Sequence, residues 1–284
     1  MNIEIEGLSF SYPEVDVFHD VTIELDRPEL YGILGPNGVG KSTLIHCINR
    51  ILEPTGGTVL VDGTDVDGYR LKELAKKLGY VPCASSDTFP MTVVDTVLIG
   101  RYPHSGWCVT KHDYDVVYET IHAMGLDDLA MRPFNELSAG QKQKVMLARG
   151  LVQQPSAILL DEPTANLDIR HQYGVTKMLK RITRDRNMLI VMVCHDLNIA
   201  SMYCDRIILM SEGTVYRTGT PQEVITEANI RKVYGVECKV IDNCGCPHVI
   251  VCDDGLDESA VSGIPASYEA EFVPDIHGRA TARS

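Results

Sequence analysis

The chain has 284 residues, of which 44% are hydrophobic and 23% charged, so its composition excludes a disordered, collagen-like or disulfide-stapled protein and predicts one globular α/β unit with subdomains. Lys and Arg number 26 against 39 Asp and Glu, a formal net charge of −13, which argues against nucleic acid as a partner because that affinity comes from clustered basic side chains. The nine cysteines are scattered through the chain, which fits a reducing cytosol better than a secreted disulfide framework.

The N-terminus carries Glu4 and Glu6 and lacks the basic and apolar regions of a signal peptide, so we expect none. The longest apolar stretches, such as residues 188–194, are far shorter than the roughly 20 residues that cross a bilayer. If the protein works at a membrane, we therefore expect it to need an integral membrane partner.

The first part of the chain opens with β signals. Residues 3–10 and 21–25 alternate apolar and polar positions, which predicts half-buried antiparallel strands. The other elements predicted in this part are strands at 31–34, 58–61 and 78–81 and helices at 44–52 and 72–77. A glycine-rich loop, residues 35–40, lies between the strand at 31–34 and the helix that follows.

The middle of the chain changes character. Strand signals disappear between residues 93 and 151, where helices at 113–124 and 141–151 predict a helical insert. Continuous apolar runs follow at 157–160, 188–193 and 207–210, with helical stretches at 173–182 and 197–204 between them. Such runs are typical of parallel strands buried on both faces, so we predict a doubly wound parallel sheet.

The end of the chain contains a predicted helix at 222–233, a cysteine-rich hairpin at 236–251 and an acidic tail that we expect to be mobile. We therefore divide the chain into three parts. These are a nucleotide-binding core with its antiparallel β subdomain at 1–85 and 152–221, a helical subdomain at 86–151 and a C-terminal extension at 222–284.

The glycine-rich loop satisfies the P-loop pattern G-x-x-x-x-G-K-[ST] between a strand and a helix, the context that such a phosphate site requires. Its backbone N–H groups would surround the β-phosphate, Lys41 would add positive charge, and the Ser42 hydroxyl would bind Mg²⁺. The alternative is a glycine-rich turn with a solvated lysine. The candidate nucleotide-binding residues here are Gly35, Pro36, Asn37, Gly38, Gly40, Lys41, Ser42 and Thr43.

A second candidate feature is the acidic pair Asp161 and Glu162, directly after the apolar run 157–160. A buried strand places carboxylates at its C-terminal end, where α/β sheets bind ligands. Asp161 then suits Mg²⁺, and Glu162 suits polarisation of an attacking water. Two solvated acids at an exposed corner would be the alternative if the P-loop were absent.

Three further motifs carry a family resemblance: Leu137-Ser-Ala-Gly-Gln141, Ala165-Asn-Leu-Asp168 and Cys194-His195-Asp196. Together with the P-loop and the acidic pair, in this order, they resemble the ATP-binding cassette (ABC) ATPases over residues 3–219. The segments 99–104 and 219–225 look most like the ATPase subunits of importers for iron complexes, haem and corrinoids.

The resemblance implies a P-loop NTPase cassette with a RecA-like parallel-sheet core, an antiparallel β subdomain, a helical subdomain with the signature motif and a short C-terminal extension. It implies ATP and Mg²⁺ as ligands, with Ser138 and Gly140 contacting the γ-phosphate bound to a second subunit. Ser138 could equally be an ordinary helix N-cap.

The remaining roles also come from the resemblance. Tyr12 would stack on adenine, unless it is a core or strand-edge tyrosine. His195 would hydrogen-bond the γ-phosphate and hold Glu162 in line, with Lys41 as the third catalytic residue. Asp168 would lie at the dimer interface and has an alternative role as a helix N-cap.

The implied partners are a second copy of the chain, an integral membrane permease and, indirectly, a substrate-binding protein, with no nucleic acid. The subunit would be peripheral, at the cytoplasmic face of the membrane. The permease helix would dock near Cys83 and residues 101–104.

Cys83 departs from the family pattern, because a glutamine that contacts Mg²⁺ and water normally follows Gly79-Tyr-Val-Pro82. A thiol is a weak hydrogen-bonding group and a soft ligand, poorly matched to Mg²⁺. We expect hydrolysis to survive with altered coupling to the membrane partner.

Cys238, Cys244, Cys246 and Cys252 could hold Zn²⁺ or an iron–sulfur cluster, but their spacing is not the usual C-x2-C. We favour unrelated small apolar side chains.

The expected function is the ATPase subunit of a metal-chelate importer. Three alternatives stay open: an oxyanion importer such as one for molybdate, a soluble ABC ATPase for iron–sulfur cluster assembly, and a regulatory module that has lost turnover.

Overall fold

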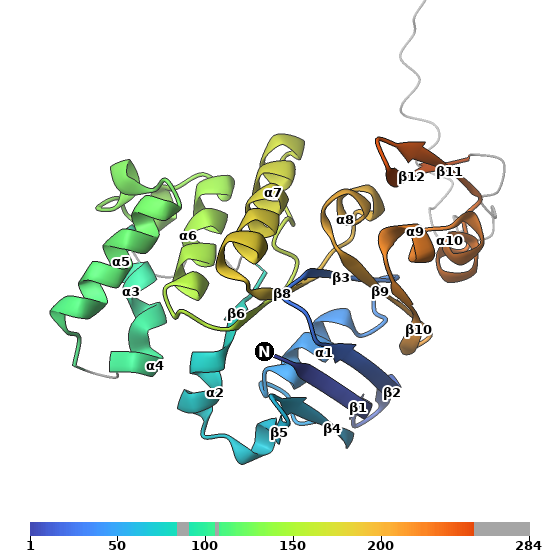
Figure 1. Cartoon of the computed structure of the whole chain (residues 1–284), viewed down its shortest axis with the longest axis horizontal. Helices are drawn as coiled ribbons and strands as arrows, with labels where there is room; N and C mark the ends of the chain where they lie inside the picture. Colours follow the sequence, from blue (N-terminus) through green and yellow to red (C-terminus); the bar gives the residue numbers. More distant parts are fainter. Residues whose placement is uncertain (84–90, 106–107, 253–284) are drawn as a thin grey trace, which may run out of the picture.

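A six-stranded sheet forms the centre of the structure, a computed structural model that describes residues 1–83, 91–105 and 108–252 (Figure 1). Its strands lie in the order β10, β9, β3, β8, β7, β6, and all neighbours are parallel except β10 and β9. The strands are β3 (Leu30–Leu34), β6 (Leu78–Val81), β7 (Ala157–Leu160), β8 (Leu189–Val193), β9 (Arg206–Ser211) and β10 (Thr214–Gly219). Every residue of β3, β7 and β8 is buried, as the apolar runs predict.

A separate four-stranded antiparallel sheet packs below this one in Figure 1. It has the order β2, β1, β4, β5, and its strands are β1 (Ile3–Tyr12), β2 (Val15–Leu25), β4 (Gly56–Val61) and β5 (Thr64–Asp65). Helix α1 (Lys41–Ile48) lies between the two sheets and buries Leu44, Ile45 and Ile48 against both. The antiparallel sheet therefore fixes the helix that follows the P-loop.

The other face of the central sheet is covered by α7 (Ile169–Arg186), α8 (Leu197–Tyr203) and the helical part of the chain. Side chains alternate across each parallel strand, so Leu160 and Met192 face these helices while Leu159 and Val191 face α1. The helical part contains α3 (Val93–Leu98), α4 (Tyr102–Ser105), α5 (Lys111–Ala123) and α6 (Ala139–Leu151), and α2 (Leu71–Lys77) precedes β6. Short 3-10 turns complete the helical part at Ile99–Arg101, Asp127–Leu129 and Phe134–Glu136, and another, Val66–Gly68, follows β5.

The C-terminal part differs from the sequence prediction. The prediction of one helix at 222–233 is wrong, because the structure has two separate helices, α9 (Pro221–Val224) and α10 (Glu227–Tyr234). Thr226 begins the second helix as its N-cap, since its hydroxyl accepts a hydrogen bond from the Asn229 backbone N–H. Strand β10 was not predicted. The predicted hairpin is present as β11 (Cys238–Asn243) and β12 (Cys246–Val251), and the acidic tail lies outside the described residues.

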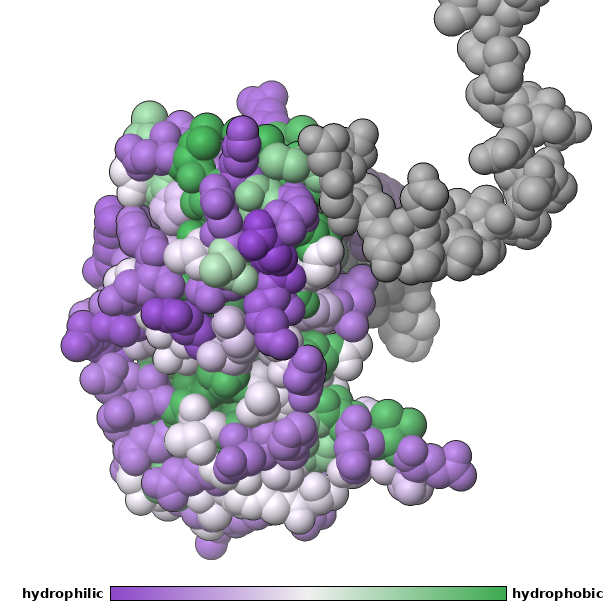
Figure 2. Space-filling view, turned by 90° about the vertical axis from the view of Figure 1, so that its right-hand side faces the viewer, coloured by the Kyte–Doolittle hydropathy of each residue, from purple (hydrophilic) through white to green (hydrophobic). Residues whose placement is uncertain are grey.

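This end of the molecule presents a mainly hydrophilic surface with scattered apolar areas (Figure 2). Within the described ranges, no helix is both long and apolar enough to span a bilayer.

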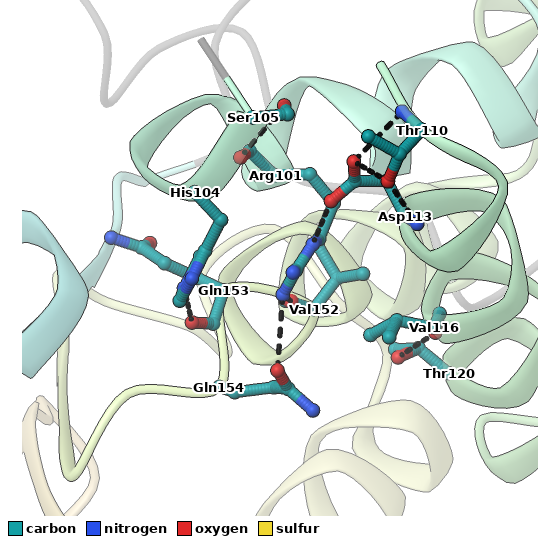
Figure 3. A network of polar contacts seen from close by, with 10 residues as sticks. All are labelled: Arg101, His104, Ser105, Thr110, Asp113, Val116, Thr120, Val152, Gln153 and Gln154. Carbon is teal, nitrogen blue, oxygen red and sulfur yellow. Dashed lines mark hydrogen bonds and ion pairs between the residues drawn. The ribbon is translucent and has the colours of Figure 1, made fainter. Parts of the chain in front are cut away.

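A buried ion pair holds the helical part together. Arg101 donates from Nε to Asp113 Oδ1 at 3.0 Å, and both side chains are less than 5% exposed (Figure 3). Arg101 Nη1 also donates to the Val152 carbonyl at 3.0 Å and to Gln154 Oε1 at 3.1 Å, while Thr110 donates to the other oxygen of Asp113. The pair thus joins the 3-10 turn Ile99–Arg101, α5 and the C-cap of α6.

We expect Arg101→Met to lower the free energy of unfolding by about 3–5 kcal/mol, because it leaves the Asp113 carboxylate buried without its cation. The control is Arg181→Met, whose ion pair with Asp185 is exposed, and its cost should stay below about 1 kcal/mol. Urea unfolding of both variants measures the difference. Equal costs would contradict a structural role for the buried pair.

The same pair gives a pH dependence. Hydrogen bonds from Thr110 and then Arg101 lower the pKa of Asp113 from 3.8 to about 2. A lowered carboxyl pKa stabilises the fold above the unfolded value, so this contribution should be lost as the pH falls from about 4 towards 2.

Candidate functional site

The P-loop is seated tightly between the two sheets. Gly40 has φ +99°, and a Cβ there would lie 3.0 Å from Val17 Cγ1 on β2. Gly35 approaches β9 so closely that a Cβ would lie 2.5 Å from the Met210 carbonyl oxygen. Glycine is therefore required at both positions, and the loop between them curves around the N-terminus of α1.

Lys41 stands at the first position of α1 and is 5% exposed. Its Nζ donates to the carbonyls of Gly35 and Pro36, each at 2.8 Å, which holds the ammonium inside the loop. Burial lowers the pKa of Lys41, while the nearby carboxylates of Glu162 and Asp161 raise it. The ammonium and the N-terminal end of α1 place positive charge where a phosphate would lie.

The Ser42 hydroxyl donates to Asp161 Oδ1 at 2.6 Å, so the P-loop and the end of β7 meet. Sequence reasoning missed two residues behind this contact. His46 Nε2 lies 2.8 Å from the Tyr80 hydroxyl and 3.8 Å from Asp161 Oδ2. The sequence could have indicated His46 through its four-residue spacing from Ser42, because residues 42 and 46 share one helix face.

Glu162 and His195 also come together, with His195 Nε2 2.6 Å from Glu162 Oε1. They follow β7 and β8, which are neighbouring parallel strands, so their C-terminal ends meet at one edge of the sheet. Glu162 has φ +48°, a backbone conformation that is uncommon outside glycine.

Lys41, Glu162 and His195 line one open pocket of about 820 Å³, whose lining does not include the predicted residues Gly35, Pro36 and Asp161. Val15 and Val17 on β2 were not predicted and form its apolar side together with Tyr12, which is 49% exposed. Its lining residues are Tyr12, Val15, Val17, Asn37, Gly38, Gly40, Lys41, Ser42, Thr43, Glu162 and His195. The volume, the apolar wall and the polar floor suit a nucleotide.

Ser138, Gly140 and Asp168 lie outside the lining of this pocket. Ser138 is the N-cap of α6 and forms a capping box with Gln141, and Asp168 is the N-cap of α7. Both structural alternatives considered for these residues are therefore present. Ser138 and Asp168 are also exposed, which leaves them accessible to another molecule.

The thiols at the end of the chain do not converge. In the hairpin register Cys238 pairs with Val251 and Cys246 with Asn243, which places the two cysteines about 17 Å apart at opposite ends of β11 and β12. Within the described part of the chain no group of three or more His, Cys, Asp or Glu side chains is arranged to hold a metal ion. Cys83 is half-buried just beyond β6.

A P-loop facing an acidic pair and a histidine at the ends of parallel strands, with a separate antiparallel sheet and a helical part, defines an ABC ATPase. Residues 18–165 match the family model described as ABC transporter, and the chain belongs to this family. It is therefore a nucleotide-binding, ATP-hydrolysing protein.

Three similar proteins extend the comparison. An uncharacterized ABC transporter ATP-binding protein of Methanocaldococcus jannaschii is 42% identical over 88% of this chain and 98% of its own. The ferric enterobactin transport ATP-binding protein of Escherichia coli is 35% identical over 86% of this chain and 92% of its own. A solved structure described as a metal-chelate type ABC transporter in an inward-facing conformation has 27% identity and a TM-score of 0.78, covering 89% of this chain and 97% of that one.

Proposed function

We propose that the chain is the ATP-hydrolysing subunit that energises a membrane importer of a metal chelate such as an iron-siderophore, haem or a corrinoid. The observation that carries the chemistry is the Glu162–His195 pair facing the Lys41 pocket. The similarity to the ferric enterobactin protein and to the metal-chelate transporter supports the transported class.

The geometry supports a simple division of work. Lys41 and the start of α1 attract the β- and γ-phosphates, and Tyr12 offers its exposed ring to adenine. Glu162 accepts the proton of the attacking water, and His195, which donates to Glu162, fixes the orientation of that carboxylate. Positioning supplies most of the rate acceleration in such phosphoryl transfer.

The donor set of Ser42 and Asp161 fits Mg²⁺, because both side chains offer oxygen and lie 2.6 Å apart beside the P-loop. When bound, the ion would neutralise charge on the phosphates. Ser42 and Asp161 would hold it, and His46 and Tyr80 would support Asp161 from behind.

A second copy of the chain would complete the site. The pocket is open, and Ser138 and Asp168 are exposed outside it, so one chain supplies the P-loop and another the signature motif. Closing and reopening of this pair is the movement that a membrane permease can use.

The proposed permease contact lies on the helical part. An apolar pocket of about 420 Å³ has Ile99 and Tyr102 at its surface, 50% and 48% exposed. The sequence placed Arg101 at this contact, but the structure does not, because the Arg101 guanidinium is buried against Asp113. The lining residues are Met91, Asp95, Leu98, Ile99, Tyr102, Ser105 and Val109.

The test is mass spectrometry of proteins that co-purify with the tagged subunit from detergent-solubilised membranes of its own host. We expect a polytopic membrane protein with the unchanged chain and its loss with Ile99→Asp, which places a charge in the apolar contact. The control is Ile241→Asp on β11, at the opposite end of the molecule (Figure 1). Recovery of soluble partners alone would favour a soluble ABC ATPase instead.

A further inference from the structure

Two turns of the chain meet at one histidine. One turn begins α6, with Ser138 as N-cap and the buried Gly140 in the first helical turn. The other begins α7, with Asp168 as N-cap. His171 follows Asp168 by three residues and touches both turns.

The contact to Asp168 fixes the imidazole ring. His171 Nδ1 lies 2.9 and 2.8 Å from the two oxygens of the Asp168 carboxylate. Hydrogen bonds from the backbone and the side chain of His171 lower the pKa of Asp168, so that carboxylate is ionised and can only accept. His171 Nδ1 therefore carries the proton and donates it.

The ring then occupies the place where a side chain at position 140 would lie. A Cβ on Gly140 would be 2.4 Å from Cδ2 and 2.9 Å from both Cγ and Nε2 of His171, distances that real Cβ atoms essentially never show. The imidazole thus packs directly on the backbone of the turn that begins α6.

Helix capping does not account for this arrangement. The N-cap bond of α7 runs from the His171 backbone N–H to Asp168 Oδ1 at 2.9 Å, and almost any residue at position 171 could supply it. The imidazole adds a second bond to the same carboxylate and a contact to Gly140, and these need a ring with a donor at the Nδ1 position.

We infer that His171 is a positioning residue that holds the starts of α6 and α7 at a fixed spacing by packing on Gly140, so that the exposed Ser138 and Asp168 meet a second copy of the chain as one preformed surface. This inference rests on the ATP-dependent pair of the proposed function. A preformed surface avoids the loss of freedom that ordering two independent turns would cost on association.

The experiment uses the full chain carrying Glu162→Gln, which slows ATP cleavage, and measures dimer formation by sedimentation velocity as ATP is added. We expect His171→Ala in this background to weaken ATP-dependent dimerisation about five- to tenfold, the lower end of the coupling that typically links two sites, because the His171–Asp168 pair is exposed. The affinity of the monomer for ATP should not change, because His171 lies outside the pocket lining.

Two conservative variants separate the contacts. His171→Asn keeps a donor near Asp168 and loses the ring, and His171→Phe keeps the ring and loses the donor. Each should restore part of the dimerisation lost in His171→Ala. The matched control is His122→Ala, which removes an exposed His–Asp contact of 3.0 Å on α5 and should have no effect.

The outcomes are distinct. If the Glu162→Gln chain does not dimerise with ATP, the proposed function fails and takes this inference with it. If it dimerises and His171→Ala dimerises equally well, the inference alone is overturned. Hydrogen exchange of the backbone amides at residues 139–141, measured without nucleotide, gives an independent test. His171→Ala should accelerate this exchange while the melting temperature stays unchanged. Unchanged exchange would also overturn the inference.

Discussion

Replacing Glu162 with Gln is expected to lower ATP turnover by about 10²–10⁴-fold, the usual contribution of a general base, while ATP binding is kept. The amide has nearly the shape of the carboxylate, so the contact with His195, now 2.6 Å long, can persist in some form. It cannot accept the proton of the attacking water. Release of inorganic phosphate from Mg-ATP in a single turnover measures the loss.

The control for this substitution is Glu24→Gln, which removes an exposed carboxylate on β2 away from the pocket lining. Its turnover should equal that of the unchanged chain. If Glu162→Gln keeps more than about a tenth of the turnover, the proton leaves by another route and Glu162 is not the general base.

The sequence predicted those parts of the fold in which local pattern and global packing agree. The apolar runs at 157–160 and 188–193 are typical of strands buried on both faces, and their parallel pairing brings Glu162 and His195 to one edge. The P-loop was predictable because glycine at positions 35 and 40 is dictated by close approach to β9 and β2.

Contacts between distant segments were not predictable. Arg101 looked like a surface residue of a docking segment, yet it is buried, because its partner Asp113 lies on another helix whose placement depends on tertiary packing. The contact of His171 with Gly140 likewise depends on how α6 meets α7. Single-sequence periodicity contains no information on such pairings.

The prediction of a single helix at 222–233 was wrong for a local reason. Thr226 and Asn229 have the N-cap spacing that begins a helix, and this signal competes with continuation of the helix from Pro221. Recognising the cap would have divided the segment correctly.

Lys41→Ala is expected to weaken ATP binding about a hundredfold or more, because each charge-assisted bond to a phosphate contributes about 1.5–3 kcal/mol and the ammonium serves two phosphates. Lys41→Arg should restore little of this. The planar guanidinium cannot replace a compact ammonium that is 5% exposed and held 2.8 Å from two carbonyl oxygens. Isothermal titration with ATP, at unchanged melting temperature, measures the effect.

The control is Lys177→Ala on the exposed side of α7, where removal of a positive charge should leave the affinity for ATP unchanged.

The burial of Lys41 also predicts a pH dependence of ATP binding by the unchanged chain. Desolvation lowers the pKa of Lys41 below 10.5, and the ammonium is the form that binds phosphate. The affinity for ATP should therefore fall as the pH rises through this lowered pKa. Lys41→Ala should lack this decline, and the same decline in that variant would show that another group titrates.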